Sequence, residues 1–444
     1  MSDVLPTAAI IAQIEALGAS LRAIATEPRN ASLANLEQAV SAAIRAAQPQ
    51  LLGAVLEVNQ RALQPPESFW KQPCPRCEQR VGVDSWRSRT VETICGTVTW
   101  QRPWYHCEGC GHGFSPVDQK LEVEARSRLS AGLHAWLLEV GTRTSFAEAA
   151  TLLAKLTGCT VSPETVRQHT ERTGAQWEAA AVAESAEVQR TQEAVGPLDP
   201  APGQLVVETD GVMVRYVDGW HEVKLGLVGG LENGELKAVS YVAARTSAAE
   251  FGPRLLAEAA RRGALEEIGW SGPVTRRGLA ILPEVVVLGD GAHWIWDQAA
   301  EHLGTRVEIV DFFHAAEHVG AIASALYPDD PAAATAWATT QRHLLRTEGG
   351  EAFCATLSQI KAPTEAGTEV LRIERGYFRT NAARMNYPEF VRRGFPIGSG
   401  AVEGGVRHVI QMRLKRPGAR WSQAGAESVI QLRCRLASGR PLAA

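Results

Sequence analysis

This chain of 444 residues lacks several features that would assign it to a class at once. We find no stretch that approaches the roughly 20 apolar residues needed to span a bilayer. The N-terminus also lacks the charged and then apolar pattern of a signal peptide. We therefore expect a cytoplasmic protein with no membrane partner. Net charge is only −4, so any nucleic-acid binding must come from local basic patches.

The cysteines are few and unevenly spread. Cys74, Cys77, Cys107 and Cys110 form two C-x-x-C pairs, whereas the other four cysteines of the chain are scattered singles. This distribution favours a metal site over a disulfide framework. The Val-, Thr- and Trp-rich segment between the pairs predicts a β-hairpin, so residues 70–122 would form a zinc ribbon in which four thiolates close around one structural Zn²⁺. Redox or merely buried thiols are the alternative.

Two helical regions flank this ribbon. Residues 1–69 are rich in Ala, Leu and Ile at helical spacing, which predicts two or three amphipathic helices for packing or dimerisation, with nucleic-acid contact as the alternative. Within residues 123–190, SFAEAATLLAKLTG and SPETVRQHTERTG predict a helix-turn-helix, with Ser162 and Pro163 starting the second helix. A plain helical hairpin is the alternative. The side chains that would contact DNA are Arg167, Gln168 and Arg172.

A mixed α/β region follows a Pro- and Gly-containing linker at residues 191–204. Residues 205–314 predict the element order β-β-β-α-β-α-β, in which Asp218-Gly219 is a strong signal for the first hairpin turn. This is the order of the ribonuclease H-like fold up to its last helix. We expect an all-helical insertion at residues 315–395. The last helix and a basic tail would then occupy residues 396–444.

Three carboxylates take the places that matter in such a fold. Asp210 lies on the first strand, Asp290 follows the fourth strand, and Glu403 lies on the last helix. If they converge, they suit a two-metal site for phosphoryl transfer. Taken singly, each has an ordinary explanation: a strand-end turn for Asp210, a helix cap for Asp290, and an i,i+4 ion pair with Arg407 for Glu403.

The chain resembles bacterial insertion-sequence transposases of the ISKra type and, more broadly, the Mutator-like DDE superfamily. The stretches that carry this resemblance are TDGVMV, WHEVKLG, LGDGAHWIW, DFFHAAEH and GFPIGSGAVEGGVRHVIQMRLKRPGARW. The resemblance implies that Asp210, Asp290 and Glu403 form a catalytic triad holding two Mg²⁺ (or Mn²⁺) ions. It also matches Asp311 and His314 to a C/D-x-x-H signature of these enzymes.

The function implied by this resemblance is recognition of transposon ends, followed by DNA strand cleavage and transfer into target DNA. Because two ends must be brought together, we expect a homodimer, associated with the bacterial nucleoid. One alternative is a catalytically silent, domesticated zinc-ribbon DNA-binding protein. Another is a metalloprotease, because His314, Glu317 and His318 match the H-x-x-E-H motif. We prefer positions near the triad for Asp311 and His314.

The C-terminal tail concentrates positive charge. From Arg407 to Arg440 it contains eight Lys or Arg and one acid, Glu427. A solvated basic face is the ordinary explanation. Phosphate binding is the interpretation we favour, because the cluster directly follows Glu403. The residues concerned are Arg407, Arg413, Lys415, Arg416 and Arg420.

Overall fold

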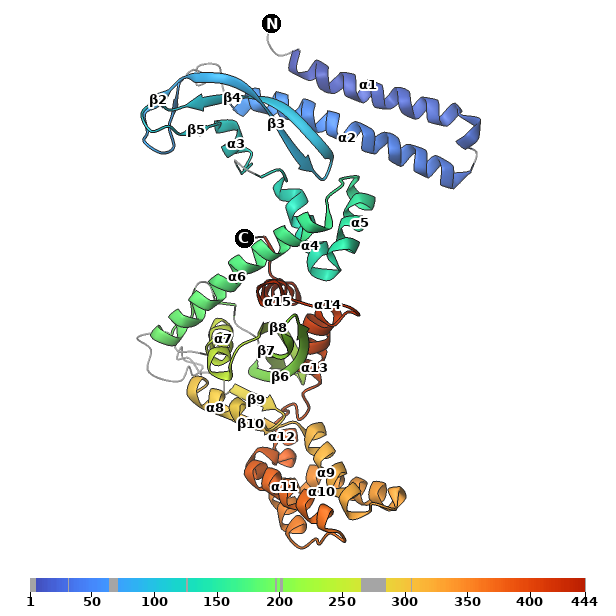
Figure 1. The fold of residues 1–444 in the computed structure, drawn as a ribbon, viewed down its shortest axis with the longest axis vertical. Coiled ribbons are helices and arrows are strands. Elements are labelled where there is room, and N and C mark those ends of the chain that lie inside the picture. Colours follow the sequence, from blue (N-terminus) through green and yellow to red (C-terminus); the bar gives the residue numbers. More distant parts are fainter. Residues whose placement is uncertain are drawn as a thin grey trace. The chain divides into compact units, whose positions relative to one another are not determined.

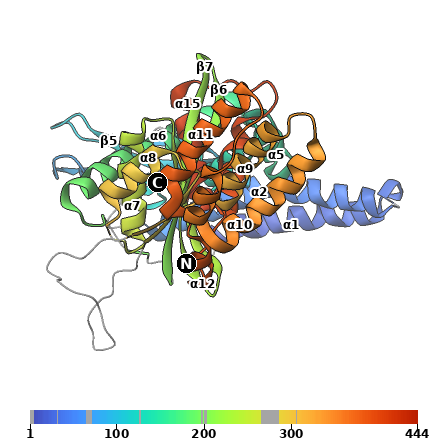
Figure 2. The same ribbon diagram turned by 90° about the horizontal axis from the view of Figure 1, so that it is seen from below.

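The computed structural model describes residues 5–30, 32–63, 71–124, 127–195, 198–199, 203–264, 285–304 and 306–443. The chain divides into two compact units, Met1–Thr170 and Glu171–Leu442, whose elements are labelled in Figure 1 and seen from another side in Figure 2. Each unit is described by itself. Part of the predicted linker at residues 191–204 lies outside the described residues.

The first unit begins with two long helices that pack along each other, α1 (Leu5–Thr26) and α2 (Leu33–Leu63). Our expectation that no stretch approaches the length of a membrane span is wrong for α1. Its segment Ala8–Thr26 has 19 residues and a mean hydropathy of 1.4, which suffices by length and composition. A single such helix near the N-terminus does not assign a membrane role, because signal sequences and helices of soluble proteins meet the same criterion.

The cysteine pairs lie at the ends of a β-hairpin, as the sequence predicts. A short two-stranded ladder precedes a three-stranded antiparallel sheet. The long hairpin turns between Thr93 and Gly96, and Gly96 has a φ of +103°, a conformation that favours glycine. The strands are β1 (Gln72–Pro73), β2 (Arg80–Val81), β3 (Val83–Thr93), β4 (Gly96–His106) and β5 (Gly113–Phe114).

Helices follow the hairpin. Ser145 and Glu148 form a capping box at the start of α5, which ends at the left-handed Gly158. The predicted start of the next helix is confirmed, because the Ser162 hydroxyl accepts the Thr165 N–H at 3.0 Å. This helix continues well beyond the predicted segment. The helices are α3 (Pro116–Lys120), α4 (Ala131–Arg143), α5 (Phe146–Thr157) and α6 (Pro163–Thr191).

The second unit is built on a five-stranded sheet with the order β10-β9-β6-β7-β8. The pairs β6–β7 and β7–β8 are antiparallel, and β6–β9 and β9–β10 are parallel. The element order is the one that the sequence predicts. The elements are β6 (Gln204–Tyr216), β7 (Gly219–Glu232), β8 (Glu235–Ala244), α7 (Ala248–Arg261), β9 (Val285–Gly289), α8 (His293–His302) and β10 (Arg306–Val310).

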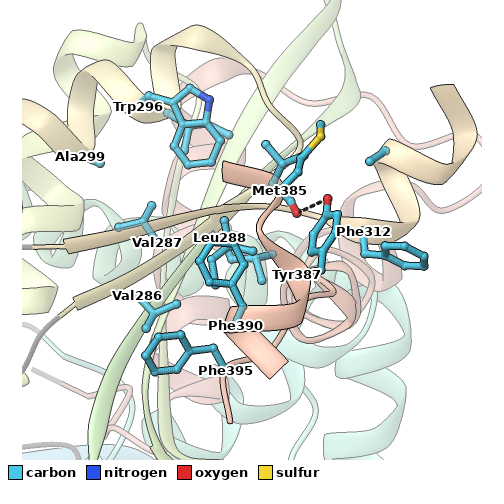
Figure 3. Packing of buried hydrophobic residues seen from close by; sticks show 14 of the residues in the cluster. Val286, Val287, Leu288, Trp296, Ala299, Phe312, Met385, Tyr387, Phe390 and Phe395 are labelled. Carbon is cyan, nitrogen blue, oxygen red and sulfur yellow. Dashed lines mark hydrogen bonds between the residues drawn. The ribbon is translucent and has the colours of Figure 1, made fainter. Parts of the chain in front are cut away.

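The segment predicted to be helical, residues 315–395, does form helices, and these share one core with the sheet. Figure 3 shows Val286 and Leu288 of the sheet beside Phe390 of the insertion. The buried Tyr387 hydroxyl donates to the Val310 carbonyl at 3.0 Å, which fixes the insertion to the end of β10. The helices are α9 (Phe312–Leu326), α10 (Pro331–Ser358, kinked at Gly349), α11 (Glu365–Asn381), a 3₁₀ turn (Ala382–Met385) and α12 (Tyr387–Arg392).

The C-terminal part contains several short elements where the sequence predicts one last helix. α13 (Gly400–Gly405) continues through a π-helical turn (Val406–Gln411) into α14 (Met412–Leu414), and α15 (Gln423–Ala437) packs on β8. α13 contacts β6 and β7. This contact carries Glu403 toward the strand that bears Asp210.

Candidate functional site

Asp210 and Asp290 come from neighbouring parallel strands. Glu208 of β6 lies opposite Leu288 of β9. Asp210 and Asp290 each come two residues later in the chain, so in this parallel pair they occupy neighbouring positions. The Gly211 N–H donates to the Asp210 carboxylate at 2.7 Å. These two carboxylates therefore start from adjacent positions where β9 ends.

Asp311 lies directly after β10, the strand next to β9 in the sheet. Val310 of β10 lies opposite Gly289 of β9, and the Asp311 N–H donates to the Gly289 carbonyl at 2.8 Å. Asp311 is buried, and its carboxylate also accepts the His314 N–H at 2.6 Å, which caps α9. Asp311 is therefore engaged with the backbone rather than turned to solvent.

Two buried carboxylates hold the segment that carries Glu403. The Asp311 carboxylate accepts the Ser399 N–H, and the Glu208 carboxylate accepts the Val402 N–H at 2.9 Å. The Glu403 side chain is exposed and accepts the Ser399 hydroxyl at 3.2 Å. The start of α13 is thus fixed to two strands of the sheet through their acidic side chains.

The three predicted triad residues share one electrostatic environment. Burial raises the pKa of Asp210, and the charges of Asp290 and Glu403 raise it further, while the Gly211 N–H and His314 act in the opposite direction. The carboxylates nevertheless gather less tightly than the cysteines. Among the described residues, the cysteines are the one group of three or more candidate ligands that could hold a metal ion, and their Sγ atoms lie within 4.8 Å of one another.

Sequence reasoning missed Glu208. This side chain is 1% exposed, and burial raises its pKa to about 7, with the charges of Asp311 and Glu403 adding to the effect. Its Oε1 has no hydrogen-bond partner. A signal was available, since Glu208 is the one other acid of the largely apolar β6 and lies two positions from Asp210, on the same face.

Close packing leaves no room for a side chain at two glycines of the motif GSGAVEGG. A Cβ atom at Gly398 would lie 2.7 Å from the Phe313 ring, and one at Gly405 would lie 2.7 Å from the Tyr241 ring. Larger side chains at either position would push the chain away from its neighbours. These glycines let the Glu403 segment approach the sheet.

The histidines of HAAEH belong to a chain of contacts that leads to Asp290. His318 Nδ1 lies 2.7 Å from a Glu374 carboxylate oxygen, and its ring stacks on Tyr377 with centroids 3.8 Å apart. The Tyr377 hydroxyl donates to the Asp290 carbonyl at 3.1 Å. His314 lies edge-on to His318. Among the described residues, His314, Glu317 and His318 do not form a group of candidate metal ligands.

Two of the three residues of α6 that we predict to contact DNA bind an acidic side chain of the same helix. Arg167 donates to the Glu164 carboxylate from Nη2 at 2.6 Å and from Nε at 2.9 Å, and Gln168 donates to it from Nε2 at 2.8 Å. Arg172 is exposed. An exposed ion pair of this kind stabilises the helix little, so a phosphate could compete for Arg167.

The basic residues after Glu403 divide into two groups. Arg407, Lys415 and Arg420 are exposed, and Arg416 is half-buried. Arg413 does not join them, which corrects our prediction that it binds DNA. It is 3% exposed, and its guanidinium lies 4.9 Å from the centre of the buried Trp421 ring. A side chain enclosed in this way has a packing role.

The four predicted zinc ligands come together. The Sγ atoms of Cys74 and Cys110 lie 3.5 Å apart, as do those of Cys77 and Cys107, and all four lie within 4.8 Å of one another. Burial opposes ionisation of Cys74, but backbone N–H groups of Arg76 and Cys77 lower its pKa to about 7. This cysteine cluster could hold one zinc ion.

The two cysteine loops have the same backbone conformation. The Glu78 N–H donates to the Cys74 carbonyl at 2.8 Å, and the Gly111 N–H donates to the Cys107 carbonyl at 2.7 Å. Glu78 and Gly111 both have a left-handed backbone, with φ of 61° and 69°. Two matched loops on one hairpin suit a shared tetrahedral ion, which redox or merely buried thiols would not require.

Comparisons with known proteins bear on part of the chain. A model of an uncharacterised protein family, UPF0236, matches residues 32–224. A curated relative from Streptococcus gallolyticus, described as "UPF0236 protein in vanSb 3'region", is 29% identical over 155 residues. This match covers 33% of this chain and 30% of the relative's length. The family match includes the cysteine cluster and Asp210 but ends before Asp290 and Glu403.

Proposed function

We propose that this chain is a DDE-type DNA transposase, which recognises the terminal inverted repeats of an insertion sequence and catalyses metal-dependent strand cleavage and strand transfer. One observation carries the proposal. Asp210, Asp290 and Glu403 come from separate elements, and the charges of the last two act on the first. An unrelated set of surface acids has no reason to gather in this way, because like charges repel.

The sheet supports this proposal. Three antiparallel strands continue into two parallel strands, which is the arrangement expected of a ribonuclease H-like core. Asp210 lies on β6, Asp290 follows β9 and Glu403 lies on α13, which are the positions that the proposal requires. The helical insertion between β10 and α13 and the resemblance to ISKra-type enzymes agree with the same interpretation.

The donor set fits hard divalent cations, which prefer oxygen ligands. Asp210, Asp290 and Glu403 would hold Mg²⁺ or Mn²⁺, and two such ions activate the attacking oxygen and stabilise the leaving oxygen of a phosphodiester. Asp311 and Glu208 position the Glu403 segment through their backbone contacts. His314 lies near enough to oppose the charge on Asp210. The cysteine cluster would hold a structural zinc.

DNA and a second copy of the chain are the partners of this activity. The exposed basic residues after Glu403 would hold the phosphates of the strand being cut. The helices of the first unit would read the ends. A homodimer would hold two ends at once.

The test is cleavage of inverted-repeat DNA from the region flanking the gene. Asp290→Asn should abolish magnesium-dependent cleavage and leave DNA binding intact, because it removes a charge and little volume. Asp297→Asn is the matched control, since Asp297 is exposed on α8. Continued cleavage by Asp290→Asn would refute the triad. Binding without cleavage by the unchanged protein would favour the silent DNA-binding alternative.

A further inference from the structure

A basic cavity lies at the tip of the β6–β7 hairpin. Its volume is about 310 Å³, within the range of small-ligand sites. Four of its eight lining residues are Arg or Lys, and none of the described residues that line it is acidic. We call it the hairpin pocket. It is lined by Arg215, Trp220, Leu414, Lys415, Arg416, Gly418, Ala419 and Arg420.

The wall of the hairpin pocket is built by backbone contacts. The Val217 N–H donates to the Trp421 carbonyl at 2.9 Å, and the Trp421 indole N–H donates to the Leu414 carbonyl at 3.1 Å. The loop between Leu414 and Trp421 is therefore closed on itself and attached to β6. Gly418, with a φ of +78°, allows its tight turn. The cavity is thus preformed.

The acidic residue of the hairpin turn contacts basic side chains that do not line the hairpin pocket. Asp218 is the acid of the turn, and its carboxylate lies 3.1 Å from Arg245 and 3.2 Å from His221. Arg215, Lys415 and Arg420 are exposed, and the described residues that line the hairpin pocket include no carboxylate. An anion is the ligand that such a site favours.

Trp220 gives the pocket its second chemical feature. Its side chain is 54% exposed, although tryptophan ordinarily buries its large ring. The Arg215 guanidinium lies 5.9 Å from the ring centre, at the outer limit of a cation–π contact. An exposed aromatic face beside phosphate-binding cations is the combination found where proteins bind unpaired nucleotides.

The position of the pocket favours a single strand over a duplex. Arg215 lies five residues along β6 from Asp210, which is about 17 Å, and on the opposite face of the strand because side chains alternate. Nucleic acid that reaches both sites must curve around the hairpin. Duplex DNA resists such bending, with a persistence length of about 150 base pairs, whereas a single strand does not.

We propose that the hairpin pocket binds one unpaired nucleotide of a DNA strand, with its base on Trp220 and its flanking phosphates on Arg215, Lys415 and Arg420. This inference rests on the proposed function, which brings a DNA strand to the carboxylates.

The test uses the whole protein in metal-free buffer with EDTA, so that no cleavage occurs. The probe is a single-stranded oligonucleotide containing 2-aminopurine, whose fluorescence is quenched when the base stacks. Trp220→Ala should abolish the quenching and weaken binding about tenfold, while Trp220→Phe should keep the quenching. Met213→Ala is the matched control, because Met213 is 47% exposed on the neighbouring strand β6 and lies outside the pocket.

Equal quenching and affinity for Trp220→Ala and the unchanged protein would overturn the inference, as would an equal loss of affinity for duplex DNA. The result is separable from the proposed function. Loss of quenching in Trp220→Ala would support the pocket even if Asp290→Asn still cut DNA. Conversely, loss of cleavage in Asp290→Asn with unchanged quenching in Trp220→Ala would refute the pocket and leave the transposase proposal in place.

Discussion

The Glu208 carboxylate accepts the Val402 N–H at 2.9 Å and thereby joins residues 194 positions apart in the chain. Val402 precedes Glu403, so a buried acid on β6 determines where the exposed acid on α13 lies. The arrangement has an electrostatic cost, since Glu208 is surrounded by protein and lies near Asp311 and Glu403. A residue kept in spite of this cost has a positioning role in our interpretation of the site.

Glu208→Gln should remove a pH-dependent loss of stability. The pKa of Glu208 is raised to about 7 in the folded chain, above its ordinary value of about 4.3. Its contribution to folding is therefore fully present below about pH 4 and is lost as the pH rises through about 7. At pH 8 the glutamine variant should have the larger free energy of unfolding, by about 3 kcal/mol.

Denaturant unfolding at pH 5 and pH 8 checks this difference. Glu235→Gln is the control, because Glu235 is exposed and should give the same curves as the unchanged protein. Glu427 also has a pKa raised to about 7 by burial, so a residual pH dependence is expected in every variant. Equal losses of stability in Glu208→Gln and the unchanged protein between the two pH values would contradict the prediction.

Two adjacent glycines of α13 offer a matched pair. A Cβ at Gly405 would meet the Tyr241 ring at 2.7 Å and Leu225 at 3.3 Å, whereas a Cβ at Gly404 has nothing within 4 Å. Gly405→Ala should destabilise the protein by about 1–3 kcal/mol and reduce cleavage by moving Glu403. Gly404→Ala should be neutral or slightly stabilising, because alanine favours helix. Thermal unfolding and cleavage rates measure both effects, and equal behaviour of the two variants would exclude this packing explanation.

The sequence predicts the elements better than it predicts their contacts. The order of strands and helices from β6 to β10 is as predicted, because β-branched runs such as VVVLG and the Asp218-Gly219 turn are local signals. The two cysteine loops are also local features. Each C-x-x-C spacing places two cysteines in one loop, and the structure brings the four sulfurs of the two loops together.

Burial of polar side chains could not be predicted in the same way. Glu208 and Arg413 are buried through contacts with residues that are distant in the chain or across a loop, Val402 and Trp421. No periodicity in a single segment encodes such contacts, because the other half of each contact lies elsewhere. The length of α6 could not be predicted for a related reason, since its later turns pack against α7 through Val188 and Leu256, and this contact is not visible in the sequence of α6 alone.

The cysteine cluster should contain one zinc ion per chain after purification. Cys107→Ser should remove it and unfold the β3–β4 hairpin, because loss of one ligand opens a tetrahedral site. Cys95→Ser is the control, since Cys95 lies outside the cluster. Elemental analysis gives the metal content and circular dichroism gives the fold. One zinc ion retained by Cys107→Ser would assign the metal to other ligands.

Substitutions at Arg413 and Arg407 distinguish a role in packing from a role in DNA binding. Arg413 is buried over Trp421, so Arg413→Ala should lower the free energy of unfolding by about 1–3 kcal/mol. Arg407 is exposed beside Glu403, so Arg407→Ala should leave stability unchanged and reduce the slope of log affinity against log salt by about one for duplex DNA. Denaturant unfolding and binding titrations across salt concentrations give both quantities. If Arg407→Ala left the salt slope unchanged, the exposed basic residues after Glu403 would have to be assigned to solvation, and the DNA path would have to follow other cations of the second unit.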